Sequence, residues 1–96
     1  MNILVTGCSG FIGYHLVQKL IDQKKKVIGI DMINDYYDVS LKKKRLRQIN
    51  LSQNKKYFSF HKFDISNRRK LEKIFLNNKI NVVVNLAAQA GVRDSI

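Results

Sequence analysis

Residues 3–13 read ILVTGCSGFIG, a short apolar strand that runs directly into three glycines spaced three residues apart. Gly7 permits the tight turn out of the strand, and Gly10 lets the backbone approach a phosphate with no Cβ in the way. Gly13 allows the following helix to pack closely, and the N-terminus of that helix offers free N–H groups to a pyrophosphate. The stretch predicts a dinucleotide-binding turn, with a glycine turn in an unrelated α/β fold as the alternative.

Strands alternate with helices along the rest of the chain. Period-2 and continuous apolar runs predict strands over residues 2–6, 27–31, 57–63 and 80–86. Apolar stripes at helical spacing predict helices over residues 11–24, 41–49 and 68–77. This order implies right-handed crossovers and an α/β fold: a partial Rossmann fold with a four-stranded parallel sheet, in the order 3-2-1-4.

Several details of these elements are expected from local residue chemistry. Ser40 is expected to cap a mostly solvated second helix, and Ser66 or Asn67 the third. The third helix is expected to bury a stripe formed by Leu71, Ile74 and Phe75. The valines at 82–84 predict that the fourth strand is fully buried, as parallel strands usually are.

Asp31 ends the second strand, 18 residues after Gly13. A carboxylate at this place accepts hydrogen bonds from the adenosine ribose hydroxyls of a dinucleotide. It would also repel a 2′-phosphate, and residues 32–34 supply no arginine to attract one. We therefore expect NAD rather than NADP, unless an arginine or lysine from elsewhere in the chain reaches the site.

Length and composition fit one globular domain of 96 residues, 45% of them hydrophobic. No apolar run is long enough for a membrane span, and the start of the chain lacks the basic and apolar regions of a signal peptide. We expect a cytoplasmic protein, because the single cysteine cannot form an internal disulfide. Cys8 itself is either a small filler beneath the cofactor or a reactive thiol at a helix N-terminus.

The net charge is +11, with basic clusters at 24–26, 42–45 and 68–70. These clusters lie in separate elements without interleaved aromatic residues, so compositional bias explains them better than a nucleic-acid or membrane surface. A basic nucleic-acid-binding protein on the same scaffold remains an alternative hypothesis. His15 and His61 have no partners at metal-binding spacing, which predicts no metal site.

The glycine spacing after Thr6, with Asp64-Ile65 and the segment 85–89, resembles the extended short-chain dehydrogenase/reductases, the NAD-dependent nucleotide-sugar epimerases and dehydratases. Segments 31–42 and 87–93 are similar to the UDP-glucuronate 4-epimerase group of that family. The resemblance implies interconversion of UDP-glucuronate and UDP-galacturonate for capsule and envelope sugars.

The resemblance also implies which residues form the site. Asp64 and Ile65 would flank the adenine, while Gln89 and Arg93 would lie towards the sugar, with Arg93 suited to its carboxylate. The residues expected to bind NAD are Gly7, Gly10, Phe11, Ile12, Gly13, Asp31, Asn34, Asp64, Ile65, Leu86, Ala87 and Ala88.

No catalytic residue is assigned, because the family's chemistry needs a tyrosine followed four residues later by a lysine. The residues four positions after the four tyrosines are Gln18, Ser40, Leu41 and His61. Residues 1–96 are therefore expected to be the N-terminal part of an NAD(P)-binding Rossmann domain without its C-terminal substrate domain, and inactive alone. Such a chain could be a non-catalytic remnant or one half of a split enzyme, and it could form oligomers through an open sheet edge.

Overall fold

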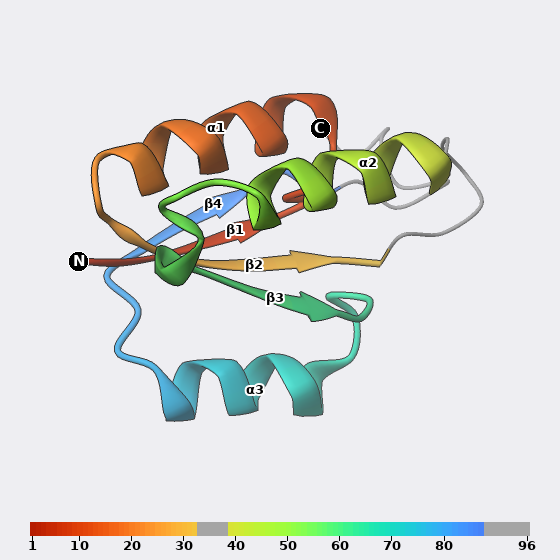
Figure 1. The fold of residues 1–96 in the computed structure, drawn as a ribbon. Helices are drawn as coiled ribbons and strands as arrows, with labels where there is room; N and C mark the ends of the chain where they lie inside the picture. The colour runs from red at the N-terminus through yellow and green to blue at the C-terminus, as the bar shows by residue number, and fades with distance from the viewer. Residues whose placement is uncertain (33–38, 88–96) are drawn as a thin grey trace.

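The computed structural model describes residues 1–32 and 39–87. Four parallel strands form one sheet in the order β3-β2-β1-β4, which confirms the expected topology (Figure 1). The elements in chain order are β1 (Asn2–Thr6), α1 (Phe11–Asp22), β2 (Lys26–Asp31), α2 (Val39–Asn50), the short 3-10 helix η1 (Lys55–Tyr57), β3 (Phe58–Lys62), α3 (Arg68–Asn77) and β4 (Val82–Asn85).

Helices cover both faces of the sheet. In Figure 1, α1 and α2 lie above it and α3 lies below it. Side chains alternate along β1, so the two faces of this strand contribute to different clusters. No helix among residues 1–32 and 39–87 has the length and apolar character to cross a membrane.

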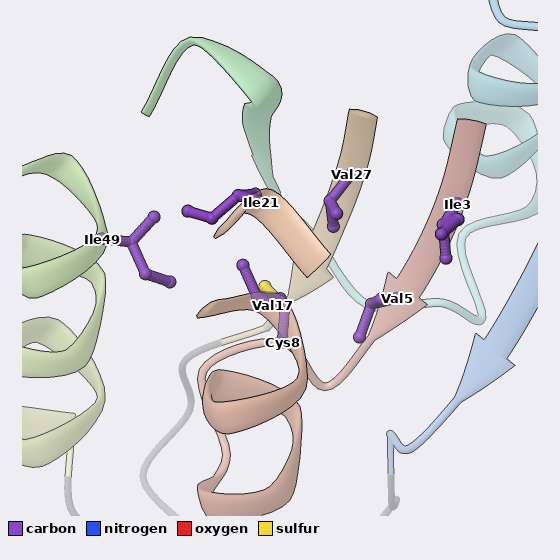
Figure 2. Close-up of a cluster of buried hydrophobic side chains, with 7 residues drawn as sticks. All are labelled: Ile3, Val5, Cys8, Val17, Ile21, Val27 and Ile49. Atoms are coloured by element: carbon purple, nitrogen blue, oxygen red, sulfur yellow. The ribbon is translucent and has the colours of Figure 1, made fainter. Parts of the chain in front are cut away.

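The larger cluster lies between the sheet and the pair α1 and α2. Figure 2 shows that β1 and β2, the turn after β1 and both helices contribute to it. Its buried members are Ile3, Val5, Cys8, Val17, Ile21, Val27 and Ile49. Ile49 is fully buried and anchors α2, while most other positions of this helix are exposed, as expected.

The smaller cluster lies on the α3 face and consists of Leu4, Ile28, Ile30 and Ile74. Asn67 caps α3, because its side chain accepts a hydrogen bond from the Lys70 N–H at 3.2 Å. Phe75 was expected in the buried stripe, and that prediction is wrong: its side chain is 45% exposed. A helix buries only a limited arc, and Ile74 and partly buried Leu71 occupy it here.

Several element boundaries differ from the sequence expectations, and β4 (Val82–Asn85) is shorter than the expected strand over 80–86. Helix α1 ends at Asp22 rather than near residue 24, because Lys24 adopts a left-handed φ of 61°. Ser40 lies inside the first turn of α2 and does not cap it. Strand β3 begins at Phe58 because Tyr57 belongs to η1.

Strand β4 is parallel, as expected, but it is not fully buried, although that had also been expected. Val82 and Val83 are exposed and Val84 is half-buried. The reason is positional: within the described ranges β4 pairs with β1 on one side and with no strand on the other. The valine run therefore has the composition of a central strand at the edge of the sheet.

Ile74 and Phe75 allow the arrangement of α3 to be tested with two adjacent substitutions. Ile74→Ala should lower the free energy of unfolding by about 2–4 kcal/mol, because it leaves a cavity against Leu4 and Ile28. Phe75→Ala should cost less than about 1 kcal/mol, because Phe75 is 45% exposed and lies outside the buried cluster. Urea unfolding followed by circular dichroism measures both; equal costs would contradict this placement of α3.

Candidate functional site

The turn after β1 is held between the two neighbouring strands. Gly7 adopts a left-handed φ of 70°, and its N–H donates to the Ile30 carbonyl of β2 at 2.8 Å. A Cβ added at Gly7 would lie 2.8 Å from the Leu86 carbonyl carbon and 2.9 Å from the Ala87 nitrogen. Glycine is needed here for both reasons, since other residues disfavour this φ and find no room.

The other two glycines bring the start of α1 against the turn. A Cβ on Gly13 would collide with the Gly7 carbonyl oxygen and approach the Cys8 Cα at 3.0 Å. Gly10 donates its N–H to the same Gly7 oxygen at 3.1 Å and accepts from Tyr14 N–H at 2.8 Å. A Cβ on Gly10 would have only one close contact, the Gly7 oxygen at 3.3 Å.

The N-terminus of α1 has the properties of an anion-binding site. Gly10 occupies the cap position with extended backbone, and no side chain caps the helix. No acidic residue lies in the first turn, and Phe11 and Ile12 are exposed beside it. The N–H groups and the positive dipole end of this turn are therefore suited to a phosphate ligand.

Asp31 lies next to this turn, at the end of β2, and is almost fully buried. Its Oδ2 accepts the Ser9 N–H at 3.1 Å, and its Oδ1 accepts from the Lys42 ammonium at 3.0 Å. The side chains of Asp31 and Lys42 are 3% and 12% exposed. A lysine from another element thus reaches the Asp31 carboxylate. The expected preference for NAD over NADP was conditional on no such arginine or lysine reaching the site.

Arg45 makes a second contact from α2. Its Nη1 donates to the Ser9 carbonyl oxygen at 3.0 Å, and its guanidinium lies 5.9 Å from the centre of the Phe11 ring. Ser9 is thereby held at its N–H by Asp31 and at its carbonyl by Arg45. Its hydroxyl is buried and has no hydrogen-bond partner among the described residues.

Sequence reasoning did not assign Lys42 or Arg45 to the site: it placed both in a basic cluster, and Arg45 also on the stripe of the second helix with Leu41 and Ile49. A signal was available, because both lie at helical spacing from Ile49, the buried anchor of α2. Positions 42, 45 and 49 share one side of the helix, so two basic residues are carried towards the protein.

The chain after β4 passes beside the glycine turn. Thr6 Oγ1 accepts hydrogen bonds from the N–H groups of Leu86 and Ala87, at 3.1 and 3.2 Å, and donates to Asn85 Oδ1. The structure therefore brings Leu86 and Ala87 together with Gly7, as expected of residues lining one cleft. Both lie where the carboxyl ends of β1 and β4 meet.

The remaining predicted residues are less closely grouped. Asp64 and Ile65 follow β3, where the Asp64 carboxylate accepts the Ser66 N–H at 3.0 Å. The Ile65 side chain packs against the smaller cluster, beneath the sheet. Four predicted residues lie outside the described ranges: Asn34, Ala88, Gln89 and Arg93.

Cys8 is a buried filler rather than a reactive thiol. Its side chain belongs to the larger cluster and is fully buried (Figure 2). Burial, with the nearby Asp31 carboxylate, raises the pKa of this thiol far above its ordinary value, so it stays protonated.

No group of three potential metal ligands occurs in the described part of the chain, where His15 packs against the rings of Phe11 and Tyr14.

The close packing at Gly13 can be tested against Gly10. Gly13→Ala should lower the free energy of unfolding by about 1–3 kcal/mol, because the new Cβ would displace the Gly7 carbonyl. The loss would occur although alanine favours the helix interior. Gly10→Ala should change it by less than about 1 kcal/mol. Urea unfolding of both variants decides the matter, and a neutral Gly13→Ala would show that the loop does not approach α1 this closely.

Cys8 should also make stability depend on alkaline pH. The unfolded thiol loses its proton above about pH 9 and the folded thiol keeps it, so the unfolded state binds fewer protons there. Stability should therefore fall as pH rises above about 9, and this group should contribute on the order of 1 kcal/mol to the fall between pH 8 and pH 10. Urea unfolding between about pH 8 and pH 10 should show a smaller fall for Cys8→Ala. If the free energy of unfolding fell equally with pH in the unsubstituted chain and in Cys8→Ala, the Cys8 thiol would be in contact with water.

Comparison with known proteins gives a consistent assignment. The family model for GDP-mannose 4,6 dehydratase matches residues 4–96. Protein CapI of Staphylococcus aureus is 55% identical over 96 residues, which are all of this chain and 28% of CapI. UDP-glucuronate 4-epimerase of Thermodesulfobacterium geofontis is 45% identical over 93 residues, 97% of this chain and 28% of that protein.

Solved structures agree with the sequence relatives. The crystal structure of UDP-glucuronic acid 4-epimerase from Bacillus cereus, in complex with UDP-glucuronic acid and NAD, matches with a TM-score of 0.77 at 39% identity. That match covers 100% of this chain and 29% of the epimerase chain, so the chain spans less than a third of the length of these relatives. The chain belongs to the NAD-dependent epimerase/dehydratase family and corresponds to an N-terminal portion of its members, among which UDP-glucuronate 4-epimerases are near relatives.

Proposed function

We propose that this chain is the NAD-binding N-terminal part of a nucleotide-sugar epimerase of the UDP-glucuronate 4-epimerase type. The observation that carries the proposal is the uncapped N-terminus of α1, held by Gly7 and Gly13 beside the buried carboxylate of Asp31. Its support from comparison is that the similar Bacillus cereus epimerase binds NAD and UDP-glucuronic acid.

The described residues fit such a cofactor. The first turn of α1 would hold the pyrophosphate, and Gly10 leaves the backbone open towards it. Asp31 would accept hydrogen bonds from the adenosine ribose, and the unpartnered Ser9 hydroxyl stands beside it. When bound, NAD supplies the hydride acceptor for oxidation of a sugar alcohol; this chain's residues bind and orient it.

Lys42 refines the proposed preference for NAD over NADP. The Asp31 carboxylate would still repel the 2′-phosphate of NADP, but the Lys42 ammonium offsets part of the carboxylate's charge. We therefore propose that NAD binds more tightly, with a smaller margin than an unpaired carboxylate would give. Asp64, Ile65, Leu86 and Ala87 would border the adenosine and the cleft.

Epimerisation itself belongs to the completed protein in this proposal. The Tyr-x-x-x-Lys spacing is absent from the 96 residues, so we propose that the chain alone holds NAD without interconverting UDP-glucuronate and UDP-galacturonate. The completed enzyme would serve capsule and envelope sugar synthesis in the cytoplasm. The second candidate, a non-catalytic remnant, is favoured by the exposed valines of β4.

Calorimetric titration of the chain with NAD and with NADP tests the proposal. NAD should bind, NADP should bind at least about tenfold more weakly, and Gly10→Ala should weaken NAD about tenfold, because its Cβ would meet the pyrophosphate. Leu51→Ala, at an exposed position after α2, is the matched control and should leave both affinities unchanged. A chain with intact circular dichroism that binds no NAD would support the remnant instead.

A further inference from the structure

Arg45 reaches from α2 to the turn that follows β1, although the two segments lie far apart in the chain. Its Nη1 donates to the Ser9 carbonyl oxygen at 3.0 Å, across a separation of 36 positions. A charged donor makes a stronger hydrogen bond than a neutral one. The base of the side chain is fixed as well, because Ile49, one helical turn further along α2, is buried in the larger cluster (Figure 2). Arg45 therefore ties the turn to the core of the protein.

The Ser9 carbonyl belongs to the peptide group that enters the N-cap of α1. A peptide group is planar, so the position of the Ser9 oxygen fixes the direction of the Gly10 N–H. That N–H donates to the Gly7 carbonyl oxygen at 3.1 Å, so the same peptide is held at both of its polar atoms. Gly10 is thereby oriented from outside the helix, by Arg45 on one side and by Gly7 on the other.

These backbone contacts matter because the side chains of the turn restrain it little. Gly10 occupies the N-cap of α1 without a side-chain hydrogen bond. The hydroxyl of Ser9 is buried and has no hydrogen-bond partner among the described residues. Glycine also has access to more backbone conformations than other residues. The conformation of the turn therefore depends on its backbone contacts with Gly7, Asp31 and Arg45.

The N-cap peptide determines where the free N–H groups of α1 are directed. The first hydrogen bond of the helix runs from the Tyr14 N–H to the Gly10 carbonyl at 2.8 Å. The N–H groups of Phe11, Ile12 and Gly13 precede it and have no partner within the helix. They are the groups suited to a phosphate oxygen. A rotation of the N-cap peptide would change the direction of all three.

Arg45 also brings a positive charge to this end of α1. Its guanidinium lies 5.9 Å from the centre of the Phe11 ring, which is exposed. Asp31 is paired with Lys42, whereas Arg45 donates to an uncharged carbonyl and forms no ion pair within residues 1–32 and 39–87. The charge of Arg45 therefore adds to the positive dipole end of the helix, in the sense that favours an anion.

We infer that Arg45 is a positioning residue of the pyrophosphate site. It holds the peptide between Ser9 and Gly10, so that the free N–H groups at the start of α1 keep the direction in which they receive phosphate oxygens. Arg45 acts through Ser9, not by contact with the ligand. The inference rests on the proposed function for the identity of the ligand, while the restraint on the turn belongs to the chain without ligand.

Arg45→Met tests the inference, because methionine keeps much of the apolar stem and has no N–H donor. Arg47→Met is the matched control, since it removes the same charge from an exposed position of the same helix. Without ligand, amide hydrogen exchange at Gly10 should become about tenfold faster in Arg45→Met, because the turn opens more easily. Exchange in the core of β1 should stay within about twofold, and Arg47→Met should leave both unchanged. NMR measures these rates residue by residue.

Calorimetric titration with NAD gives the functional readout. Arg45→Met should weaken NAD binding about tenfold, and Arg47→Met should weaken it by less than about twofold. Arg45→Lys restores a charged donor and should bind NAD within about threefold of the unsubstituted chain. The loss in Arg45→Met should persist at about 1 M salt, where a charge that acts at a distance is screened.

Faster exchange at Gly10 in Arg45→Met, with no NAD binding by any form of the chain, would uphold the restraint on the turn and contradict the proposed function. Equal NAD affinities of Arg45→Met and Arg47→Met would overturn the inference, as would equal exchange at Gly10. A loss of affinity that salt abolishes would also overturn it, since Arg45 would then act by charge alone. If circular dichroism shows Arg45→Met unfolded, Arg45→Gln takes its place, because that shorter side chain ends before the Ser9 carbonyl.

Discussion

The fold of this chain depends on the close approach between the turn after β1 and the first turn of α1. Gly7 turns the chain at a left-handed φ, and Gly13 has no room for a Cβ because the Gly7 carbonyl occupies that space. The contact fixes the direction in which α1 leaves the sheet. Val17 and Ile21 then meet β1 and β2 in the larger cluster (Figure 2). The same approach leaves the N–H groups of α1 uncapped and aimed at the carboxyl ends of the strands.

Helix α2 adds a second constraint on that turn. Ile49 anchors the helix in the core. One turn nearer the start of α2, Arg45 donates a hydrogen bond to the Ser9 carbonyl oxygen. About one turn before that, Lys42 forms an ion pair with Asp31. Ser9 is therefore fixed from two sides by groups of opposite charge. The Ser9 backbone is thus fixed between the uncapped start of α1 and the Asp31 carboxylate, the two groups proposed to bind the pyrophosphate and the ribose of a dinucleotide.

Sequence reasoning predicted what local patterns determine. The glycine spacing, the apolar runs of β1 and β2, and the Asn67 cap are short-range features, and the topology followed from strand–helix alternation with the right-handed crossover rule. It failed where a residue's role is set by a distant segment. Helical spacing from Ile49 indicates that Lys42 faces the protein, but it does not identify Asp31 as its partner, and no local pattern predicts the hydrogen bonds from Leu86 and Ala87 to Thr6. Phe75 was misplaced because apolar spacing cannot show which arc of a helix the sheet covers.

The failure at β4 has a different meaning. The run Val82–Val84 predicts a fully buried strand, but Val82 and Val83 are exposed and Val84 is half-buried against the larger cluster. The strand's composition is suited to a larger sheet than these elements form. The polar residues of β3 show that this chain does protect an edge that faces water. The contrast between the two edges therefore indicates where the rest of the fold belongs, independently of any catalytic residue.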